Sequence, residues 1–279
     1  MKDSVRTIQV GRARVHIINM GMVHADLAEW LRVPQQERTS ATEQYFEQPM
    51  VVPVLSVLIE LPETAILVDA CDPLTLAHSS QAEPDDRGSV DLNVRLAALG
   101  IPPERIEHVV ITHLHFDHFS GVTRERQGRR VPCFPQAQHH IGRADWAGIA
   151  VQLIGHDSLE SKTLAVIQRH GLLNLVDRNT EIADEVRILA APGESPGHQI
   201  VRFHSNGQTL YCLGDLYHHT VEVEQPEWVV HWADPETTRR SREQLIAAAL
   251  AEDALLTATH IPTLGRLCAT PDGVRWDAL

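Results

Sequence analysis

The chain has 279 residues, of which 43% are hydrophobic and 22% are charged, and its formal net charge is −13 at pH 7. These proportions are typical of a folded protein, and the negative charge argues against nucleic acid and anionic membranes as partners, because their phosphates would be repelled. From this length we expect one domain over residues 1–279. No stretch has the length of a membrane span or of a signal peptide's apolar region, so we expect the protein in the cytoplasm.

The first strands are predicted from alternating apolar residues. Residues 7–19 alternate around a glycine and predict a β-hairpin, and residues 51–61 and 64–68 predict a second strand pair. The stretch 25–50 between them is too long for a simple connection and contains apolar residues such as Trp30. We expect it to form a flap or a short-helix excursion that covers a site or the seam of a homodimer.

Helices and further strands are expected in the rest of the chain. Asp91 is a suitable N-cap for an amphipathic helix that ends at Gly100, and residues 109–111 predict a buried strand. The same patterns predict helices near 143–150, 158–170 and 235–251, and strands at 186–191, 199–205, 208–213 and 254–258. Segments rich in β-structure thus precede helices twice, which predicts an α+β fold with four layers in the order αββα.

Cysteine and histidine differ in what they indicate about metals. No CxxC pair occurs among Cys71, Cys133, Cys212 and Cys268, which favours reduced thiols over disulfides or a cysteine-bound zinc ion. Histidine occurs 17 times, with dense runs around 113–118, 139–140 and 218–219. Because neutral imidazole is the commonest metal ligand, the composition points to a metal site.

The densest histidine run, THLHFDH at residues 112–118, directly follows a predicted strand. In an extended turn alternate side chains share a face, so His113 and His115 can reach one ion. Asp117 and His118 can reach a second ion once the chain has turned into a helix. The alternative is a polar loop that caps the helix, with Asp117 as a plain N-cap. Apolar residues between the histidines favour the metal site, because they anchor the loop against a core.

Three later residues at predicted strand ends are further candidate ligands: His198, Asp215 and His260. Each is weak evidence alone, since a histidine after a Gly-Pro turn or an aspartate after a glycine is usually a surface or turn residue. Their occurrence in this order after the 112–118 run is what makes them candidates.

Together these residues resemble the motifs of the metallo-β-lactamase superfamily, namely HxHxDH, a downstream His, Gly-Asp and a final His. The resemblance extends to Asp69 at the end of a strand and to the PGESPGH stretch at 192–198. It implies a metallo-β-lactamase-like αββα sandwich with a binuclear site between the sheets. The implied ligands are His113, His115 and His198 for one ion, Asp117, His118 and His260 for the other, and Asp215 as the bridge.

The resemblance implies hydrolysis by two Zn²⁺ ions, with Fe, Mn or Co as other candidate metals. A hydroxide shared by the ions would attack a lactone or ester carbonyl, and Asp117 or Asp215 would carry the proton to the leaving alkoxide. True β-lactamases of the superfamily lack an aspartate at the position of Asp215, so the substrate is not expected to be an antibiotic.

The stretch GDLYHH at 214–219 resembles most the branch of N-acyl-homoserine lactonases and methyl parathion hydrolases. In the lactonases a tyrosine shortly after the bridging aspartate helps to hold the substrate carbonyl. Tyr217 lies one position closer, so it is a candidate catalytic residue or, alternatively, a packed core tyrosine. The superfamily's usual histidine is replaced by Glu194, and His218 and His219 are either supports for Asp215 or surface residues.

Two other functions stay open at this point. Phosphotriester hydrolysis needs the same metal pair, and only the pocket would distinguish it; we expect Trp30, Trp228 and Trp232 to be able to line that pocket. An iron-dependent oxygenase on the same fold belongs to another class and would be revealed by its metal. A non-catalytic binding protein is disfavoured, since all seven implied ligands are present.

Overall fold

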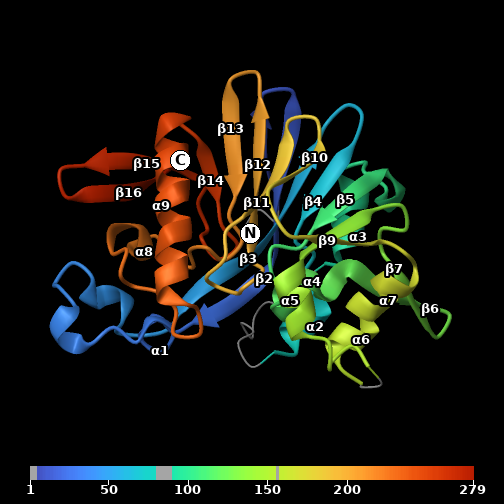
Figure 1. Ribbon diagram of the computed structural model, residues 1–279, viewed down its shortest axis with the longest axis horizontal. Helices are drawn as coiled ribbons and strands as arrows, with labels where there is room; N and C mark the ends of the chain where they lie inside the picture. Colours follow the sequence, from blue (N-terminus) through green and yellow to red (C-terminus); the bar gives the residue numbers. More distant parts are fainter. Residues whose placement is uncertain (1–4, 80–89, 155–156) are drawn as a thin grey trace.

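The computed structural model describes residues 5–79, 90–154 and 157–279, and within them two seven-stranded sheets face each other (Figure 1). The first sheet has the order β1 (Val5–Val10), β2 (Ala13–Ala25), β3 (Met50–Glu60), β4 (Ala65–Val68), β5 (Ile106–Val110), β8 (Gln138–Gly142) and β9 (Leu173–Val176). The second has the order β10 (Thr180–Ala183), β11 (Val186–Ala190), β12 (Gln199–Ser205), β13 (Gln208–Cys212), β14 (Leu255–Thr257), β15 (Gly265–Thr270) and β16 (Gly273–Ala278). Both sheets mix antiparallel and parallel pairs.

The helices and one small hairpin surround these sheets. The α-helices of the described residues are α1 (Leu27–Leu31), α2 (Pro73–Ala77), α3 (Leu92–Ala98), α4 (Phe116–Phe119), α5 (Arg143–Gly148), α6 (Leu159–Lys162), α7 (Leu164–Arg169), α8 (Val221–Glu224) and α9 (Pro235–Ala251). Four short 3₁₀ helices are η1 (Gln35–Glu37), η2 (Glu43–Tyr45), η3 (Pro103–Arg105) and η4 (Ser120–Val122). The hairpin consists of β6 (Thr123–Arg126) and β7 (Arg129–Pro132).

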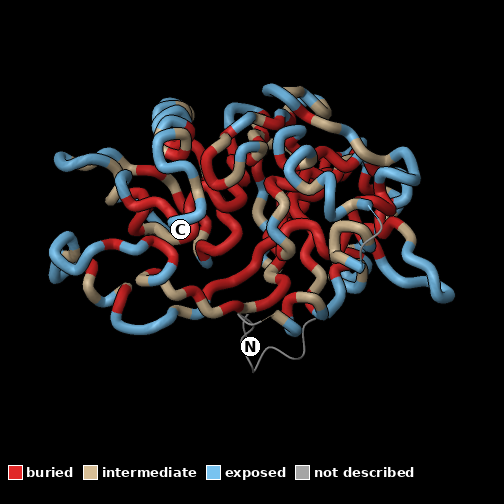
Figure 2. The backbone as a smooth tube through the Cα atoms, turned by 60° about the horizontal axis from the view of Figure 1, so that its bottom comes forward, coloured by how far each residue is buried: buried red, intermediate tan, exposed pale blue. Residues whose placement is uncertain are grey.

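Three apolar cores separate four layers, which follows from the alternation of side chains along a strand. In β3, Val57 and Ile59 belong to the core between the sheets, whereas Leu58 packs into the outer core with α3 and α7. The second sheet repeats this arrangement, with an outer core that it shares with α9. Figure 2 shows buried chain through the middle of the molecule and exposed chain around it. The predicted αββα order is therefore confirmed.

Several elements differ from the sequence-based expectations. The helix expected at 158–170 is broken into α6 and α7 at Thr163, whose hydroxyl donates a hydrogen bond to the Leu159 carbonyl at 2.6 Å. Such a bond back to the preceding turn is known to bend helices. Residues 265–278 form the hairpin β15–β16, which no pattern had indicated. The four cysteines are free, as expected.

The stretch expected to be a flap packs against the protein's own chain. It contains α1, η1 and η2, and the backbone carbonyl of Trp30 accepts a hydrogen bond from His231 at 2.8 Å. The Phe46 ring contacts the Trp228 ring, with centroids 5.5 Å apart. Segment 25–50 therefore lies beside segment 216–232 (Figure 1).

The two sheets are joined directly at one end of the sandwich. The Gln199 side chain, at the start of β12, donates hydrogen bonds to the carbonyls of Ile111 at 2.8 Å and His140 at 3.0 Å. At the other side of the same end, the Leu55 amide of β3 donates to the Thr259 carbonyl at 3.1 Å. Loops from both sheets are thus brought together there. Of the helices described, none has the length and apolar character needed to cross a membrane.

Candidate metal centre

The 112–118 run lies at this joined end, and Asp69 fixes its start. β5 ends at Val110, and the Asp69 carboxylate accepts hydrogen bonds from the Thr112 amide at 2.8 Å and the Thr112 hydroxyl at 2.9 Å. The chain then turns into the short helix α4, for which His115 is the N-cap residue. This turn brings Asp117 and His118 round toward the same space as His113.

Three imidazole rings are oriented by hydrogen bonds at Nδ1. His118 Nδ1 lies 2.8 Å from Asp69 Oδ2, His198 Nδ1 lies 3.0 Å from the Ala191 carbonyl, and His260 Nδ1 lies 2.9 Å from the Pro53 carbonyl. When such a ring is neutral and donates from Nδ1 to oxygen, its Nε2 is unprotonated and free to bind a metal. Metal-binding histidines are characteristically held in this way.

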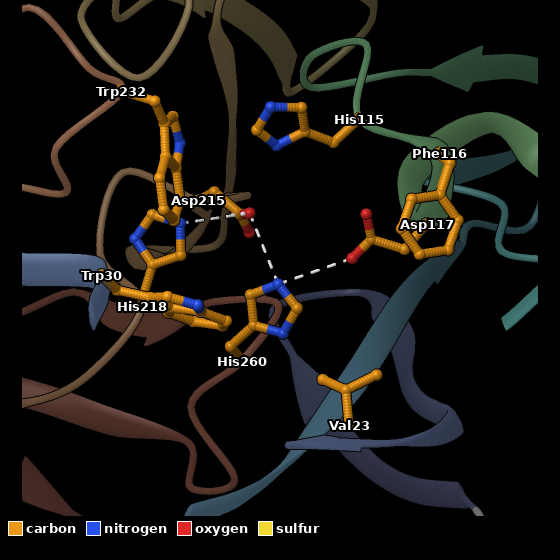
Figure 3. A pocket seen from close by; sticks show the side chains of 9 residues that line it. All are labelled: Val23, Trp30, His115, Phe116, Asp117, Asp215, His218, Trp232 and His260. Carbon is orange, nitrogen blue, oxygen red and sulfur yellow. Dashed lines mark ion pairs between the residues drawn. The ribbon is translucent and has the colours of Figure 1, made fainter. Parts of the chain in front are cut away.

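The Asp215 carboxylate lies at the centre of the converging rings. Its Oδ2 is 3.7 Å from His113 Nε2, 3.3 Å from His118 Nε2 and 3.4 Å from His260 Nε2. Asp117 Oδ2 lies 3.6 Å from His118 Nε2 and 3.5 Å from His260 Nε2. Figure 3 shows Asp215, His260 and Asp117 in this arrangement.

These separations fit shared metal ligands. Two atoms that each lie about 2.1 Å from one tetrahedral ion are about 3.4 Å from each other. Several buried atoms also form no hydrogen bond within the described residues, among them His113 Nε2, His118 Nε2, Glu194 Oε2 and Asp215 Oδ1. Burial of unpaired polar atoms is unfavourable, so a cation that binds them accounts for the arrangement.

The potential ligand atoms form two groups. One contains His113, His115, Glu194 and Asp215, and the other contains Asp117, His118 and His260. Asp215 links the groups through its contacts with His118 and His260. The structure therefore brings together two ligand clusters consistent with a binuclear site.

His198 and Glu194 differ from expectation in their placement within this centre. The His198 ring lies beside the His113 ring, with centroids 5.3 Å apart, and its Nε2 is 3.3 Å from the Asp215 amide. His198 thus borders the first group, and Glu194 is a member of it. The sequence marks Glu194 only as the residue that replaces the superfamily's usual histidine.

The histidines at the first ligand group favour the neutral form. Burial, together with the neighbouring His118 and His115, holds the pKa of His113 well below its ordinary value. Burial also lowers the pKa of His198 to about 4.

The histidines of the second group are disposed to be protonated when no metal is bound. Burial lowers the pKa of His260, but the carboxylates of Asp215 and Asp117 outweigh it and raise that pKa to about 9. Burial is likewise outweighed at His118, where Asp215, Asp117 and Asp69 raise the pKa well above its ordinary value. Conversely, His260, His118 and His218 outweigh burial at Asp215 and hold its pKa well below the ordinary value.

A cavity of about 280 Å³ gives access to these groups. Its polar floor contains Asp117, Asp215 and His260, and its wall includes the rings of Trp30 and Trp232 (Figure 3). The two indoles meet edge to face, with centroids 5.8 Å apart. The centre therefore lies at the base of a pocket with aromatic walls.

Comparison with known proteins assigns the family. The sequence model described as the metallo-beta-lactamase superfamily matches residues 49–260, most of the chain. The chain belongs to the metallo-beta-lactamase superfamily. Its two clusters of potential metal-binding side chains are consistent with a binuclear metal site.

Two curated proteins are distantly similar in sequence. A Bacillus cereus protein named N-acyl homoserine lactonase is 24% identical over 178 residues, 60% of this chain and 65% of that protein. N-acyl homoserine lactonase AttM from Azorhizobium caulinodans is 28% identical over 187 residues, 64% of this chain and 65% of that protein. The chain thus spans 65% of the length of each relative.

Two solved structures share the metallo-beta-lactamase fold over the whole chain. The crystal structure of hydrolase AbOPH has a TM-score of 0.81 at 18% identity and covers 100% of this chain and 98% of its own. AidC, a dizinc quorum-quenching lactonase solved with a product, has a TM-score of 0.77 at 19% identity, over 99% of this chain and 97% of its own. At these identities the likeness shows the fold, in agreement with the predicted sandwich.

Tyr217 does not line the described cavity. Its ring is buried in the outer core of the second sheet, and the Arg242 guanidinium lies over it at 4.5 Å from the centroid. Burial raises the pKa of the Tyr217 hydroxyl. The geometry thus gives Tyr217 the packing role that was the alternative reading. Trp228 also packs elsewhere, against Phe46, instead of lining the pocket.

His218 lines the cavity beside Asp215. Its Nε2 is 3.4 Å from Asp215 Oδ2, and its ring stacks on His260 with an interplanar angle of 9°. The adjacent His219 packs against Tyr45 instead. Of these two neighbouring histidines, only His218 lines the described cavity, and the sequence does not distinguish between them.

Proposed function

We propose that this protein is a metal-dependent hydrolase that opens lactone rings with a pair of zinc ions, and that N-acyl-homoserine lactones are its substrates. One observation carries the proposal: Asp215 Oδ2 lies within 3.3–3.7 Å of imidazole nitrogens from both ligand clusters, at the floor of an aromatic pocket. Zinc is proposed because imidazole-rich ligand sets suit it.

The ions, when bound, would lower the pKa of a water molecule and polarise the carbonyl of the substrate. Asp215 would hold the two clusters in register, because its carboxylate contacts both. The Asp117 carboxylate lines the cavity and contacts the same cluster as His260, so it is placed to pass a proton to the ring oxygen as the ring opens. Trp30 and Trp232 would exclude water and bind the apolar part of the substrate.

The cavity favours a small substrate. Its volume of about 280 Å³ is at the lower end of pockets for small molecules, which begin at about 300 Å³. Val23 and Phe116 add apolar surface to the walls formed by the two tryptophans. A lactone ring over the polar floor would therefore leave room for a short acyl chain along these walls.

The comparisons support the choice of substrate class. Two curated relatives are named N-acyl homoserine lactonase, and the lactonase AidC shares the fold over almost the whole chain. A phosphotriester remains the main competing substrate, because it needs the same pair of ions.

The proposal is tested by kinetics of the zinc-loaded protein on homoserine lactones with acyl chains of increasing length and on an aryl phosphotriester. We expect ring opening with a preference for short chains, and kcat/KM for the phosphotriester lower by at least about 100-fold. Because Asp117 is itself a potential ligand, Asp117→Asn is measured at saturating Zn²⁺, where its kcat should be lower by about 10²–10⁴-fold. Faster turnover of the phosphotriester, or full activity of Asp117→Asn, would contradict the proposal.

A further inference from the structure

Glu194 is a buried carboxylate at the metal centre for which the superfamily pattern has no role. It lies in the loop between β11 and β12, and its side chain is only 1% exposed. A buried carboxylate needs compensation by hydrogen bonds or by a positive charge. The neighbours of its two oxygens therefore indicate what it does.

The loop around Glu194 is fixed on both sides. Gly193 adopts φ of 142°, where a Cβ atom would lie 2.5 Å from the Thr238 backbone. On the other side, the Asp145 carboxylate accepts hydrogen bonds from the Ser195 hydroxyl and the Gly197 amide, both at 2.6 Å. The direction of the Glu194 side chain is thus set by the fold.

The two carboxylate oxygens have different surroundings. Oε1 accepts a hydrogen bond from the Trp232 indole at 2.7 Å and lies 3.4 Å from His115 Nδ1. Oε2 lies 3.6 Å from His113 Nε2, and it is buried without a hydrogen-bond partner among the described residues. His113 Nε2 is also buried without a hydrogen-bond partner there. An unpaired acceptor therefore faces an unpaired ring nitrogen.

We propose that Glu194 Oε2 is an additional metal ligand, which binds the ion shared by His113 and His115. Its distance from His113 Nε2 is close to the roughly 3.4 Å expected between two ligands of one tetrahedral ion. The Trp232 hydrogen bond occupies Oε1 and leaves Oε2 for the ion. This proposal rests on the metal centre of the proposed function, but not on the choice of substrate.

A third carboxylate beside Asp117 and Asp215 changes the character of the centre. It adds negative charge and an oxygen donor to a set dominated by imidazole, and oxygen donors suit harder cations such as Mn²⁺ better than imidazole does. Trp232 also lines the cavity, so the hydrogen bond to Glu194 connects the pocket wall to the ion.

The test is calorimetric titration of the metal-free full-length chain with Zn²⁺, alone and against a chelator of known affinity. Glu194→Gln keeps an acceptor for Trp232 but loses the anionic donor. We expect the affinity of one of the two ions to fall at least about tenfold. Glu227→Gln is the matched control, because it removes one charge from an exposed glutamate, and its affinities should equal those of the wild type.

The visible spectrum of the Co²⁺ form gives a second readout that does not depend on activity. We expect Glu194→Gln to change the cobalt bands, and Glu194→Asp to bind more tightly than Glu194→Gln. If Glu194→Gln proves unstable, the comparison of Glu194→Asp with the wild type decides the question by the same two measurements. Wild-type affinity and an unchanged spectrum in the variants would overturn the inference. Loss of metal affinity in a protein that opens no lactone would uphold it and sink only the proposed substrate.

Discussion

Asp69 supports the metal centre without lining the cavity. Its backbone has φ of 58°, a conformation that few residues except glycine adopt readily, and its carboxylate bonds both Thr112 and His118. Strain of this kind is retained where the surroundings determine it. The hydrogen bond to His118 Nδ1 should set the ring orientation and increase the basicity of Nε2.

We therefore predict that Asp69→Asn weakens metal binding by about 10–100-fold, because the carboxylate behind His118 is lost. Asparagine tolerates positive φ, so the backbone is retained. Competition with a chromophoric chelator measures the effect. Asp72→Asn, which keeps a good N-cap for α2, is the control and should bind metal normally. Equal affinities in the two variants would show that Asp69 only supports the backbone.

The two ions should respond differently to pH. His113 and His198 have lowered pKa values and are neutral at pH 7, so the ion beside them displaces few protons. His260, with its pKa raised to about 9, must lose a proton before it binds the other ion. His118 of the same group also has a raised pKa, so the affinity for that ion should rise by at least about tenfold per pH unit up to about pH 9.

The metal-free protein should show the opposite trend in stability. A histidine whose folded pKa is raised stabilises the fold fully below its unfolded pKa, about 6.5, and this contribution is lost as pH rises through the folded pKa of about 9.

The difference between the two ions in pH dependence is tested by calorimetry in buffers of different ionisation enthalpy, which counts the protons released as each ion binds. Equal release for both ions would contradict the assignment.

At the scale of elements, the turn after β13 positions Asp215. Gly214 has φ of 54°, and a Cβ atom there would lie 2.6 Å from the Thr112 hydroxyl. We predict that Gly214→Ala destabilises the fold by about 1–3 kcal/mol and weakens metal binding. Gly207→Ala is the matched control, because it has φ of 74° but no atom within 4 Å of the new Cβ. Denaturant unfolding should show the larger loss for Gly214→Ala, and equal losses would mean that contact with Thr112 is unimportant.

Elements with strong local patterns could be predicted from the sequence. The hairpin near 7–19, the helix capped by Asp91 and the long helix α9 depend on neighbouring residues, and the structure contains all three. The break at Thr163 depends on one side-chain hydrogen bond, and the hairpin β15–β16 has no alternation strong enough to reveal it. The spacing of apolar residues along the sequence therefore predicts neither the helix break at Thr163 nor the hairpin β15–β16.

In the candidate site too, residues in a local pattern could be predicted from the sequence, whereas contacts between distant segments could not. The run at 112–118 could be found because its spacing is local, and the structure gathers its histidines and Asp117 around Asp215. The contacts of Glu194 with Trp232 and of His218 with His260 join loops that are distant in sequence. Periodicity carries no information about such contacts.

At the scale of the whole molecule, the metal centre connects the two sheets. The ligands of residues 113–118 follow β5 of the first sheet, whereas Asp215 and His260 follow β13 and β14 of the second. The apolar core between the sheets is formed without these residues. Metal should therefore strengthen a fold that already exists without it.

We predict that chelation lowers the melting temperature but leaves the far-ultraviolet circular dichroism unchanged. An ion at 100 times its dissociation constant stabilises the folded state by about 2.7 kcal/mol. Returned Zn²⁺ should restore the melting temperature. Loss of secondary structure on chelation would instead mean that the sandwich folds only around its ions.

We propose a binuclear hydrolase centre whose two ligand clusters are linked by Asp215, and metal content measured together with lactone turnover is its sharpest test. We predict about two zinc ions per chain in the purified protein, with ring opening that chelation abolishes and added Zn²⁺ restores. Asp215→Asn should bind fewer ions. Iron as the bound metal, or one ion per chain without hydrolysis, would contradict the account and favour an oxygenase on the same fold.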